Sequence, residues 1–230
     1  MAASDLQAIM PVRRIPKNYV SVTGRFASCK NGRALGFESL LERDYMLLLE
    51  FDDEVVSFEE QPVQIAVPKG DRRAGTQYVP DVLVHYKPSP DGTAKPSVLA
   101  EVKKTSDLKV NAAKYAAKFA AATSFAEGRG WVFRTVSELE IRTPRLENLK
   151  FLREFRLAER DPKLAGLILS GLSAVGIMLP ISVMIDELFP TESERLNGLP
   201  VLWQMIASNE IGADLDQPLN NESMIWSLRS

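Results

Sequence analysis

Three charged side chains near the ends of two apolar runs could perform chemistry together. Asp81 stands in the run 78–84, directly after a proline, and Glu101 and Lys103 close the run 98–103. A Pro/Gly-containing loop joins the two β-rich runs, which predicts a pair of neighbouring strands. Because side chains alternate along a strand, Glu101 and Lys103 point to the same face. An acid and a base then lie side by side, with a second acid on the neighbouring strand.

Two carboxylates on adjacent strands suit a divalent cation. Placing Asp81 beside Glu101 costs like-charge repulsion unless a cation lies between them, and hard oxygen ligands favour Mg²⁺. Such an ion neutralises phosphate charge and lowers the pKa of bound water, while Lys103 would orient the attacking water and stabilise charge on the phosphate. The set predicts phosphodiester hydrolysis. The alternative is an ordinary Glu–Lys pair at a solvated strand end.

A fourth candidate, Glu42, lies on a segment with a helical pattern. Apolar residues recur at three- and four-residue spacing over 37–51, which predicts a helix. If the helix begins before Ser39, Glu42 is free to complete the metal shell from the helix side. The sequence from Ser39 to Glu42 also fits a capping box, in which the glutamate only closes the helix start. Both interpretations stay open.

The other segments of the first 160 residues predict alternating strands and helices. Hydrophobic patterning favours strands at 55–58, 63–67 and 131–136, a loop at 70–77, an alanine-rich helix at 107–127 and an amphipathic helix at 146–157. The polar and basic stretch 11–33 indicates an arm or a loose hairpin.

Composition limits the class of protein. The chain has 230 residues, of which 45% are hydrophobic, enough to bury one or two cores. A single cysteine, Cys29, excludes an internal disulfide framework, and with only one histidine, His85, no Cys/His zinc cluster forms. Residues 1–10 lack the features of a signal peptide, so a cytoplasmic protein is expected.

The charge is divided between two parts of the chain. Residues 1–160 carry 25 Lys+Arg against 21 Asp+Glu, a net +4, whereas 161–230 carry 3 against 9, a net −6. A catalytic domain over 1–160 and a separate domain over 161–230 are therefore expected to have different partners. The candidates for contact with DNA phosphates are basic, with plain solvated surface as the alternative: Arg13, Arg14, Lys17, Arg25, Lys104, Lys114 and Lys118.

The acidic tail predicts a small helical domain. No charged residue falls between Lys163 and Asp186, but interrupting glycines and Pro180 argue against a membrane span. Two short buried helices are expected, followed by short strands or a hairpin, which suggests a winged helix-turn-helix. The expected helices are 163–171 and 180–189, and the expected strands are 199–207, 212–219 and 223–228. The net charge makes DNA an unfavourable ligand for this domain.

Longer stretches of the first domain resemble a known family. Pro80-Asp81 followed about twenty residues later by Glu101-Val102-Lys103 is the signature of restriction-endonuclease-like nucleases. The segments 37–45 and 48–52, with Glu60-Gln61-Pro62 and Tyr78-Val79-Pro80-Asp81, resemble TnsA, the endonuclease subunit of heteromeric cut-and-paste transposases. The resemblance covers about residues 15–140 and is looser over the tail.

The resemblance implies a fold and an activity. The fold is α/β, a restriction-endonuclease-like core with a central mixed sheet flanked by helices, followed by a C-terminal winged helix-turn-helix-like domain. The activity is Mg²⁺-dependent cleavage of the 5′ strands at transposon ends, with one or two ions per site and Mn²⁺ as an alternative. The family's catalytic acids fall on Glu42 and Asp81, and its strand pair on Glu101 and Lys103. Glu42, Asp81 and Glu101 are thus the expected metal ligands, although some members carry glutamine in place of Glu101.

The resemblance also implies partners. These are double-stranded DNA at transposon ends, a DDE transposase that cuts the other strand, and the AAA+ ATPase regulator TnsC, which would dock on residues 161–230. No membrane is expected, and the protein would associate with the nucleoid during transposition. Two alternatives stay open. One is a stand-alone nuclease of the same fold for restriction, repair or phage DNA processing, and the other is a non-catalytic adaptor that joins an ATPase to DNA.

Overall fold

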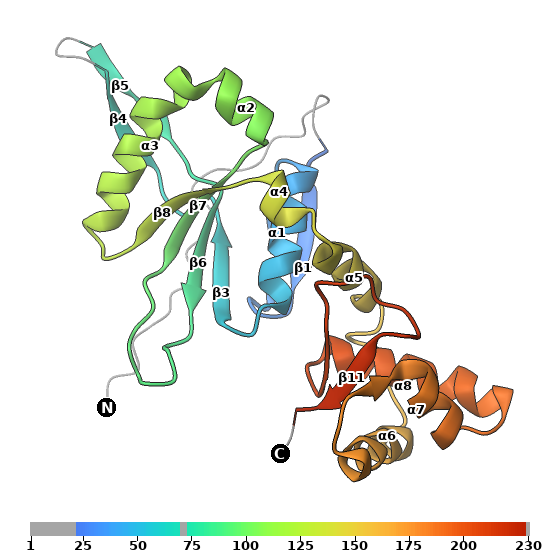
Figure 1. The fold of residues 1–230 in the computed structure, drawn as a ribbon. Helices are drawn as coiled ribbons and strands as arrows, with labels where there is room; N and C mark the ends of the chain where they lie inside the picture. The colour runs from blue at the N-terminus through green and yellow to red at the C-terminus, as the bar shows by residue number, and fades with distance from the viewer. Residues whose placement is uncertain (1–21, 70–72, 229–230) are drawn as a thin grey trace. The chain divides into compact units, whose positions relative to one another are not determined.

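The computed structural model describes residues 22–69 and 73–228, and the chain divides into two compact units, residues 1–141 and 142–230 (Figure 1). The sequence placed this division later, after residue 160. The charged residues Arg13, Arg14 and Lys17, which the sequence proposed as DNA contacts, lie outside the described part of the chain.

The first unit is built on a mixed four-stranded sheet with the order β3-β6-β7-β8. These strands are β3 (Val55–Glu60), β6 (Val82–Tyr86), β7 (Val98–Val102) and β8 (Val132–Val136). The first two pairings are antiparallel and the β7–β8 pairing is parallel, as the expected mixed central sheet requires. The register places Val82 opposite Ala100. Asp81, directly before β6, and Glu101, near the end of β7, therefore lie at the same end of the two antiparallel strands.

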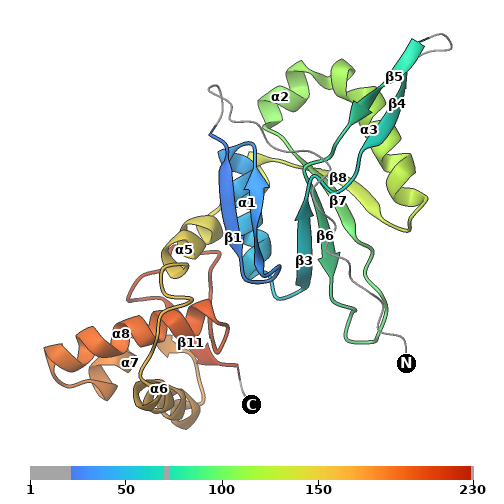
Figure 2. The ribbon, with the colours of Figure 1, turned by 180° about the vertical axis from the view of Figure 1, so that it is seen from behind.

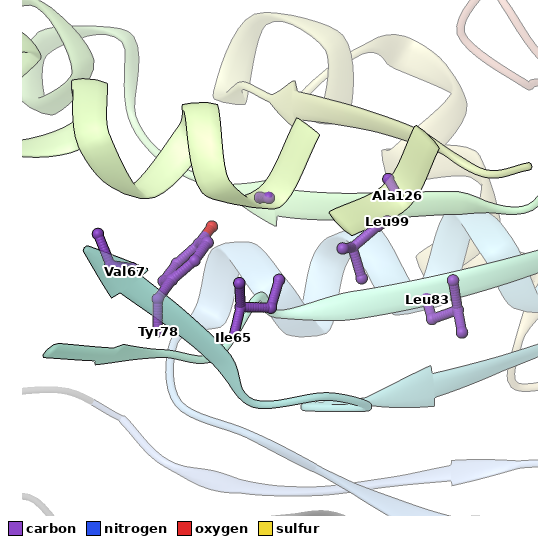
Figure 3. Close-up of a cluster of buried hydrophobic side chains, with 7 residues drawn as sticks. Ile65, Val67, Tyr78, Leu83, Leu99 and Ala126 are labelled. Atoms are coloured by element: carbon purple, nitrogen blue, oxygen red, sulfur yellow. The ribbon is translucent and has the colours of Figure 1, made fainter. Parts of the chain in front are cut away.

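One face of this sheet is covered by α3 (Ala112–Glu127), and a hairpin of β4 (Ile65–Lys69) and β5 (Arg73–Tyr78) packs against the same helix (Figures 1 and 2). Figure 3 shows part of the core between them, in which Leu83 and Leu99 of the sheet join side chains of the hairpin and the alanine-rich face of α3. Small alanine side chains, such as Ala122 and Ala126, let the helix backbone approach the sheet closely.

Three predictions in this region were wrong in their boundaries. The loop expected at 70–77 is largely the strand β5. The expected single strand 78–84 is two strands, because Pro80 has no N–H to donate to a ladder and separates the end of β5 from the start of β6. The expected helix 107–127 is divided at Asn111 into α2 (Thr105–Val110) and α3.

The N-terminal part of the described chain forms a hairpin and a helix. Strands β1 (Gly24–Ser28) and β2 (Arg33–Phe37) pair antiparallel, and the turn between them places Gly32 at a φ of 61°, which glycine adopts without strain. Helix α1 (Leu40–Phe51) follows and packs against β3 and β7. The buried Glu50 accepts hydrogen bonds from the Ser28 hydroxyl at 2.6 Å and from two backbone N–H groups of the turn, which ties the hairpin to α1.

The second unit consists of short elements in the order helix, helix, strand, helix, helix, strand, strand. They are α5 (Pro144–Leu152), α6 (Pro162–Val175), β9 (Leu179–Pro180), α7 (Ile181–Leu188), α8 (Glu192–Ala207), β10 (Ile211–Ala213) and β11 (Met224–Ser227). The strands form an antiparallel sheet with the order β10-β11-β9. A short helix, α4 (Glu138–Ile141), ends the first unit.

The strand expected at 199–207 was wrong, because this segment is the second half of α8. A capping box between Thr191 and Glu194 starts the helix. Pro200 lies inside it and has no N–H to donate to the Leu196 carbonyl. Almost all residues of α8 after Pro200 are buried, so this half of the helix is a nearly continuous apolar run. Periodicity alone does not distinguish such a run from a buried strand.

Apolar packing holds the second unit together. Ile168, Leu172, Leu202 and Met205 are almost completely buried, and the ring of Trp203 meets Phe151 of α5 edge to face. Within the described chain, no helix is long and apolar enough to span a membrane.

Candidate active site

The ends of β6 and β7 bring Asp81, Glu101 and Lys103 together. The Asp81 N–H donates to the Ala100 carbonyl at 3.1 Å, and the Val102 N–H donates to Oδ2 of Asp81 at 2.7 Å. These bonds fix the carboxylate against the end of β7. The Lys103 Nζ lies 2.8 Å from Oε1 of Glu101 and 3.3 Å from Oδ2 of Asp81, so one ammonium bridges both acids.

Tyr78 is a member of this site that sequence reasoning missed. Its hydroxyl donates to Oε2 of Glu101 at 2.8 Å, and the ammonium of Lys118 lies 5.7 Å from the centre of its ring. Burial and the charge of Glu101 raise the pKa of Tyr78, so the hydroxyl remains a donor. The sequence did contain a signal, since Tyr78 has a polar hydroxyl and lies three residues before Asp81 of the acidic motif.

Burial gives the site unusual electrostatics. Glu101 is only 4% exposed. Burial raises the pKa of the Asp81 carboxyl well above its ordinary value, and the Glu101 carboxylate adds to this, against the opposing effect of Lys103. Burial lowers the pKa of Lys103, but Asp81 and Glu101 together raise it by more, so the pKa of the ammonium lies above its ordinary value. The lysine is therefore a permanent positive charge between two acids.

Glu42 lies close enough to this group to interact with it electrostatically, but its carboxylate is already hydrogen-bonded. Helix α1 begins at Leu40 with Ser39 as its N-cap, so the expectation that the helix starts before Ser39 was wrong. Oε2 of Glu42 accepts from the Glu38 N–H at 2.7 Å and Oε1 accepts from the Ser39 hydroxyl at 2.9 Å. Burial raises the pKa of Glu42 against the lowering effect of these hydrogen bonds. Glu42 thus closes the start of α1 and adds negative charge beside Asp81 and Lys103.

The donor set fits a divalent cation held by few protein ligands. Among the described residues, no group of three or more His, Cys, Asp or Glu side chains is arranged to hold a metal ion. Mg²⁺ commonly binds one or two carboxylates and completes its shell with waters and substrate phosphates, so Asp81 and Glu101 are a sufficient pair. In the described chain no hydrogen bond reaches Oδ1 of Asp81, which leaves this oxygen available to a cation.

The basic residues proposed for DNA contact occupy different settings. Arg25 of β1 donates to the Ala34 carbonyl at 3.3 Å. Lys104 is the exposed N-cap residue of α2 and directly follows Lys103. On α3, Lys114 is exposed, whereas Lys118 is half-buried against Tyr78. Two of these candidates therefore lie near the acidic site: Lys104 directly follows Lys103 in the chain, and Lys118 contacts Tyr78.

The mixed sheet, with the acid–lysine group at its strand ends, fits an α/β nuclease core. Residues 52–138 match the family model described as the TnsA-like endonuclease N terminal, so the first unit carries a TnsA-like endonuclease domain. The match includes Asp81, Glu101 and Lys103 but neither Glu42 nor the second unit. No curated protein matches the chain. The domain implies nuclease activity.

Proposed function

We propose that the chain is the Mg²⁺-dependent DNA endonuclease subunit of a cut-and-paste transposase and cleaves the 5′ strands at transposon ends. The observation that carries this proposal is the pair of carboxylates, Asp81 and Glu101, bridged by Lys103 at adjacent strand ends of a TnsA-like domain. The remaining transposition machinery would be a DDE transposase and an AAA+ ATPase.

Each residue has a role that its position supports. Asp81, through its available Oδ1, and Glu101 would hold the cation, with Mn²⁺ as an alternative to Mg²⁺. When bound, the cation supplies charge neutralisation at the phosphate and an acidified water. Lys103 has three donors and a flexible stem, so it can turn from the carboxylates towards the attacking water or a phosphate oxygen. Tyr78 keeps Glu101 oriented, and Glu42 strengthens the negative potential that attracts the cation.

The second unit supports a docking role in this proposal. Its order of one helix, a short strand, two helices and two further strands from α6 to β11 is compatible with a winged helix. A surface pocket of about 690 Å³ is lined mainly by apolar side chains of α6, the following turn and the end of β11. Ile177 and Met178 line it and are 69% and 57% exposed. An apolar surface on an acidic domain suits a protein partner, here the AAA+ ATPase, better than DNA.

The test is cleavage of a plasmid that carries the transposon ends by the full chain, with the DDE transposase, the ATPase and Mg²⁺ present. We expect 5′-strand cleavage by the parent and none by Asp81→Asn, which keeps the size of the side chain but removes its charge. Asp91→Asn, in an exposed loop of the same unit, is the matched control and should cleave normally.

The same assay separates the alternatives. Efficient cleavage of DNA by the chain alone, without either partner, would support a stand-alone nuclease instead. If the parent chain links the ATPase to DNA but cleaves no DNA, the result would support a non-catalytic adaptor. Full cleavage by Asp81→Asn would contradict the assigned site.

A further inference from the structure

Gln61, directly after β3, has an unusual backbone conformation for its residue type. Its φ is 46°, in the left-handed region, and among the described non-glycine residues only Gln61 and Asn209 have a positive φ. Asparagine tolerates this region because its short polar side chain bonds locally, but glutamine has no such advantage. A strained residue of this kind persists only where the surrounding structure fixes it, and such residues cluster at functional sites.

Two hydrogen bonds fix Gln61 next to the candidate active site. Its backbone N–H donates to the carbonyl of Asp81 at 2.9 Å, which continues the β3–β6 pairing by one residue beyond the ladder. Its side-chain Nε2 donates to Oε1 of Glu38 at 2.9 Å, and the Glu38 N–H in turn donates to Glu42. Gln61 therefore connects the strand that carries Asp81 with the helix start that carries Glu42.

The side-chain oxygen of Gln61 lacks a hydrogen-bond partner. The residue is 7% exposed, and its Oε1 is buried with no partner anywhere in the described part of the chain. Exchanging the amide oxygen and nitrogen does not remove the problem, because it would place an oxygen against the Glu38 carboxylate and leave the NH₂ group unpaired. Buried polar groups almost always have a partner, so an unpaired oxygen at a site indicates a missing donor or cation.

The charges around this oxygen indicate what the missing group is. Glu38 and Glu42 are acidic, and Asp81, directly before β6, accepts from the Gln61 backbone, so the surroundings attract a positive ligand that brings donors. A hydrated divalent cation has both properties, since its bound waters are strong donors. A neutral acceptor such as an amide oxygen can hold such a water without adding to the repulsion between the acids.

We propose that Gln61 is a further residue of the cation site, where its side-chain oxygen accepts a hydrogen bond from a water molecule of the cation held by Asp81 and Glu101. The inference rests on the proposed metal-dependent function and adds a residue to it. Gln61 would act as a positioning residue, because its left-handed backbone holds the amide nitrogen against Glu38 and leaves Oε1 available to a bound water.

The test measures cation binding and needs no cleavage. Mn²⁺ is titrated into the full chain by isothermal calorimetry, with thermal unfolding recorded for each variant without metal. Gln61→Met replaces the amide with an apolar group of similar length and is expected to weaken Mn²⁺ binding by about tenfold, the usual effect of losing a group that supports a metal ligand. Gln77→Met, an exposed glutamine of β5, is the matched control and should bind as the parent does.

A second variant keeps the test decisive if Gln61→Met does not fold. Gln61→Asn suits the left-handed backbone and retains an amide, but it is one methylene shorter, so we expect a folded protein with weakened Mn²⁺ binding. Parental Mn²⁺ affinity in either folded variant would overturn the role of Gln61 and leave only a structural one. If the parent itself shows no Mn²⁺ binding, or Asp81→Asn binds as the parent does, the proposed cation site fails as a whole.

Discussion

The two units of the chain differ in the kinds of side chain that they bury and expose. Among the described residues, six of the seven buried polar or charged side chains lie in the first unit, where Glu50, Glu60 and Glu101 are each at most 5% exposed. Of the sixteen exposed large apolar side chains in the described part of the chain, ten lie in the second unit, which is the shorter one. The first unit buries charged side chains despite the desolvation penalty, and the second unit exposes apolar side chains to water.

From this difference we expect the first unit to carry the reacting site and the second unit to bind a partner. A buried carboxylate that is held by a tyrosine and a lysine is fixed in position and strongly affected by its neighbours, which is what a reacting site requires. An exposed apolar surface is inert in chemical terms, but it gains free energy when a partner covers it. Substitutions in the first unit should therefore change rates and cation binding, and those in the second unit should change assembly.

The largest effect is expected for Lys103→Met. Asp81 and Glu101 would lose the ammonium that bridges them, so the free energy of unfolding without metal should fall by about 2 kcal/mol. Cleavage with Mg²⁺ should fall by about 10²–10³-fold, the usual effect of removing a group that stabilises transition-state charge. Single-turnover cleavage and urea unfolding measure the two losses. Cleavage within a factor of two of the parent would contradict the role of Lys103.

Tyr78→Phe should have a smaller effect on the same site. It removes only the hydroxyl that donates to Oε2 of Glu101, so cleavage and Mn²⁺ affinity should each fall by about tenfold. Tyr86→Phe, on β6, serves as the control. Unchanged Mn²⁺ affinity in Tyr78→Phe would show that the hydroxyl only stabilises the fold.

Glu42→Gln tests how far the reacting site extends towards α1. The amide keeps an acceptor for the Glu38 N–H, so the helix start should persist, whereas the loss of charge should slow cleavage by less than about tenfold. Circular dichroism and cleavage rates are the measurements. Complete loss of cleavage with folding intact would instead make Glu42 a direct metal ligand.

Asp81→Asn should stabilise the protein when no divalent cation is present. The raised pKa of Asp81 means that the folded state binds this proton more tightly than the unfolded state does, so its contribution is fully present below the ordinary pKa and is lost as pH rises through the raised pKa. Asn mimics the protonated form, so the variant should gain on the order of 1 kcal/mol at neutral pH and none at low pH. Thermal unfolding from pH 3 to 8 in EDTA checks this, and a variant less stable than the parent at pH 7 would contradict it.

The smallest effect on stability is expected in the second unit. Replacing Ile177 and Met178 together by serine changes only exposed side chains, so the free energy of unfolding should stay within about 0.5 kcal/mol of the parent. Binding to the ATPase should weaken measurably, while Mn²⁺ binding at the acidic site stays parental. Equal ATPase binding by parent and variant would move the docking surface elsewhere.

The sequence predicted most of the first unit because its signals are local. Alternation along β7 placed Glu101 and Lys103 on one face, and their side chains do lie 2.8 Å apart. The strands near 55–60, 98–102 and 132–136 were also predicted, since each is a short apolar run between turn signals.

The failures depend on partners that are distant in sequence. Strand β5 contains arginine, glycine and threonine and becomes a strand only by pairing with β4, which no local pattern shows. The contact of Tyr78 with Glu101 spans 23 residues and that of Gln61 with Glu38 also spans 23, so neither residue could be assigned to the site from spacing alone. In α8, burial on several sides hid the helical period.

The proline inside α8 gives the two halves of this helix different dynamic properties. Before Pro200, the exposed first turns are held by the N-cap Thr191 and by the close packing of Gly198 against Phe189. The Leu196 carbonyl receives no hydrogen bond from residue 200, because proline has no N–H. After Pro200, the side chains from Val201 to Trp203 are anchored in the core. Hydrogen exchange of backbone amides should therefore be fast in the first half and slow in the second, as two separately opening segments of one continuous helix.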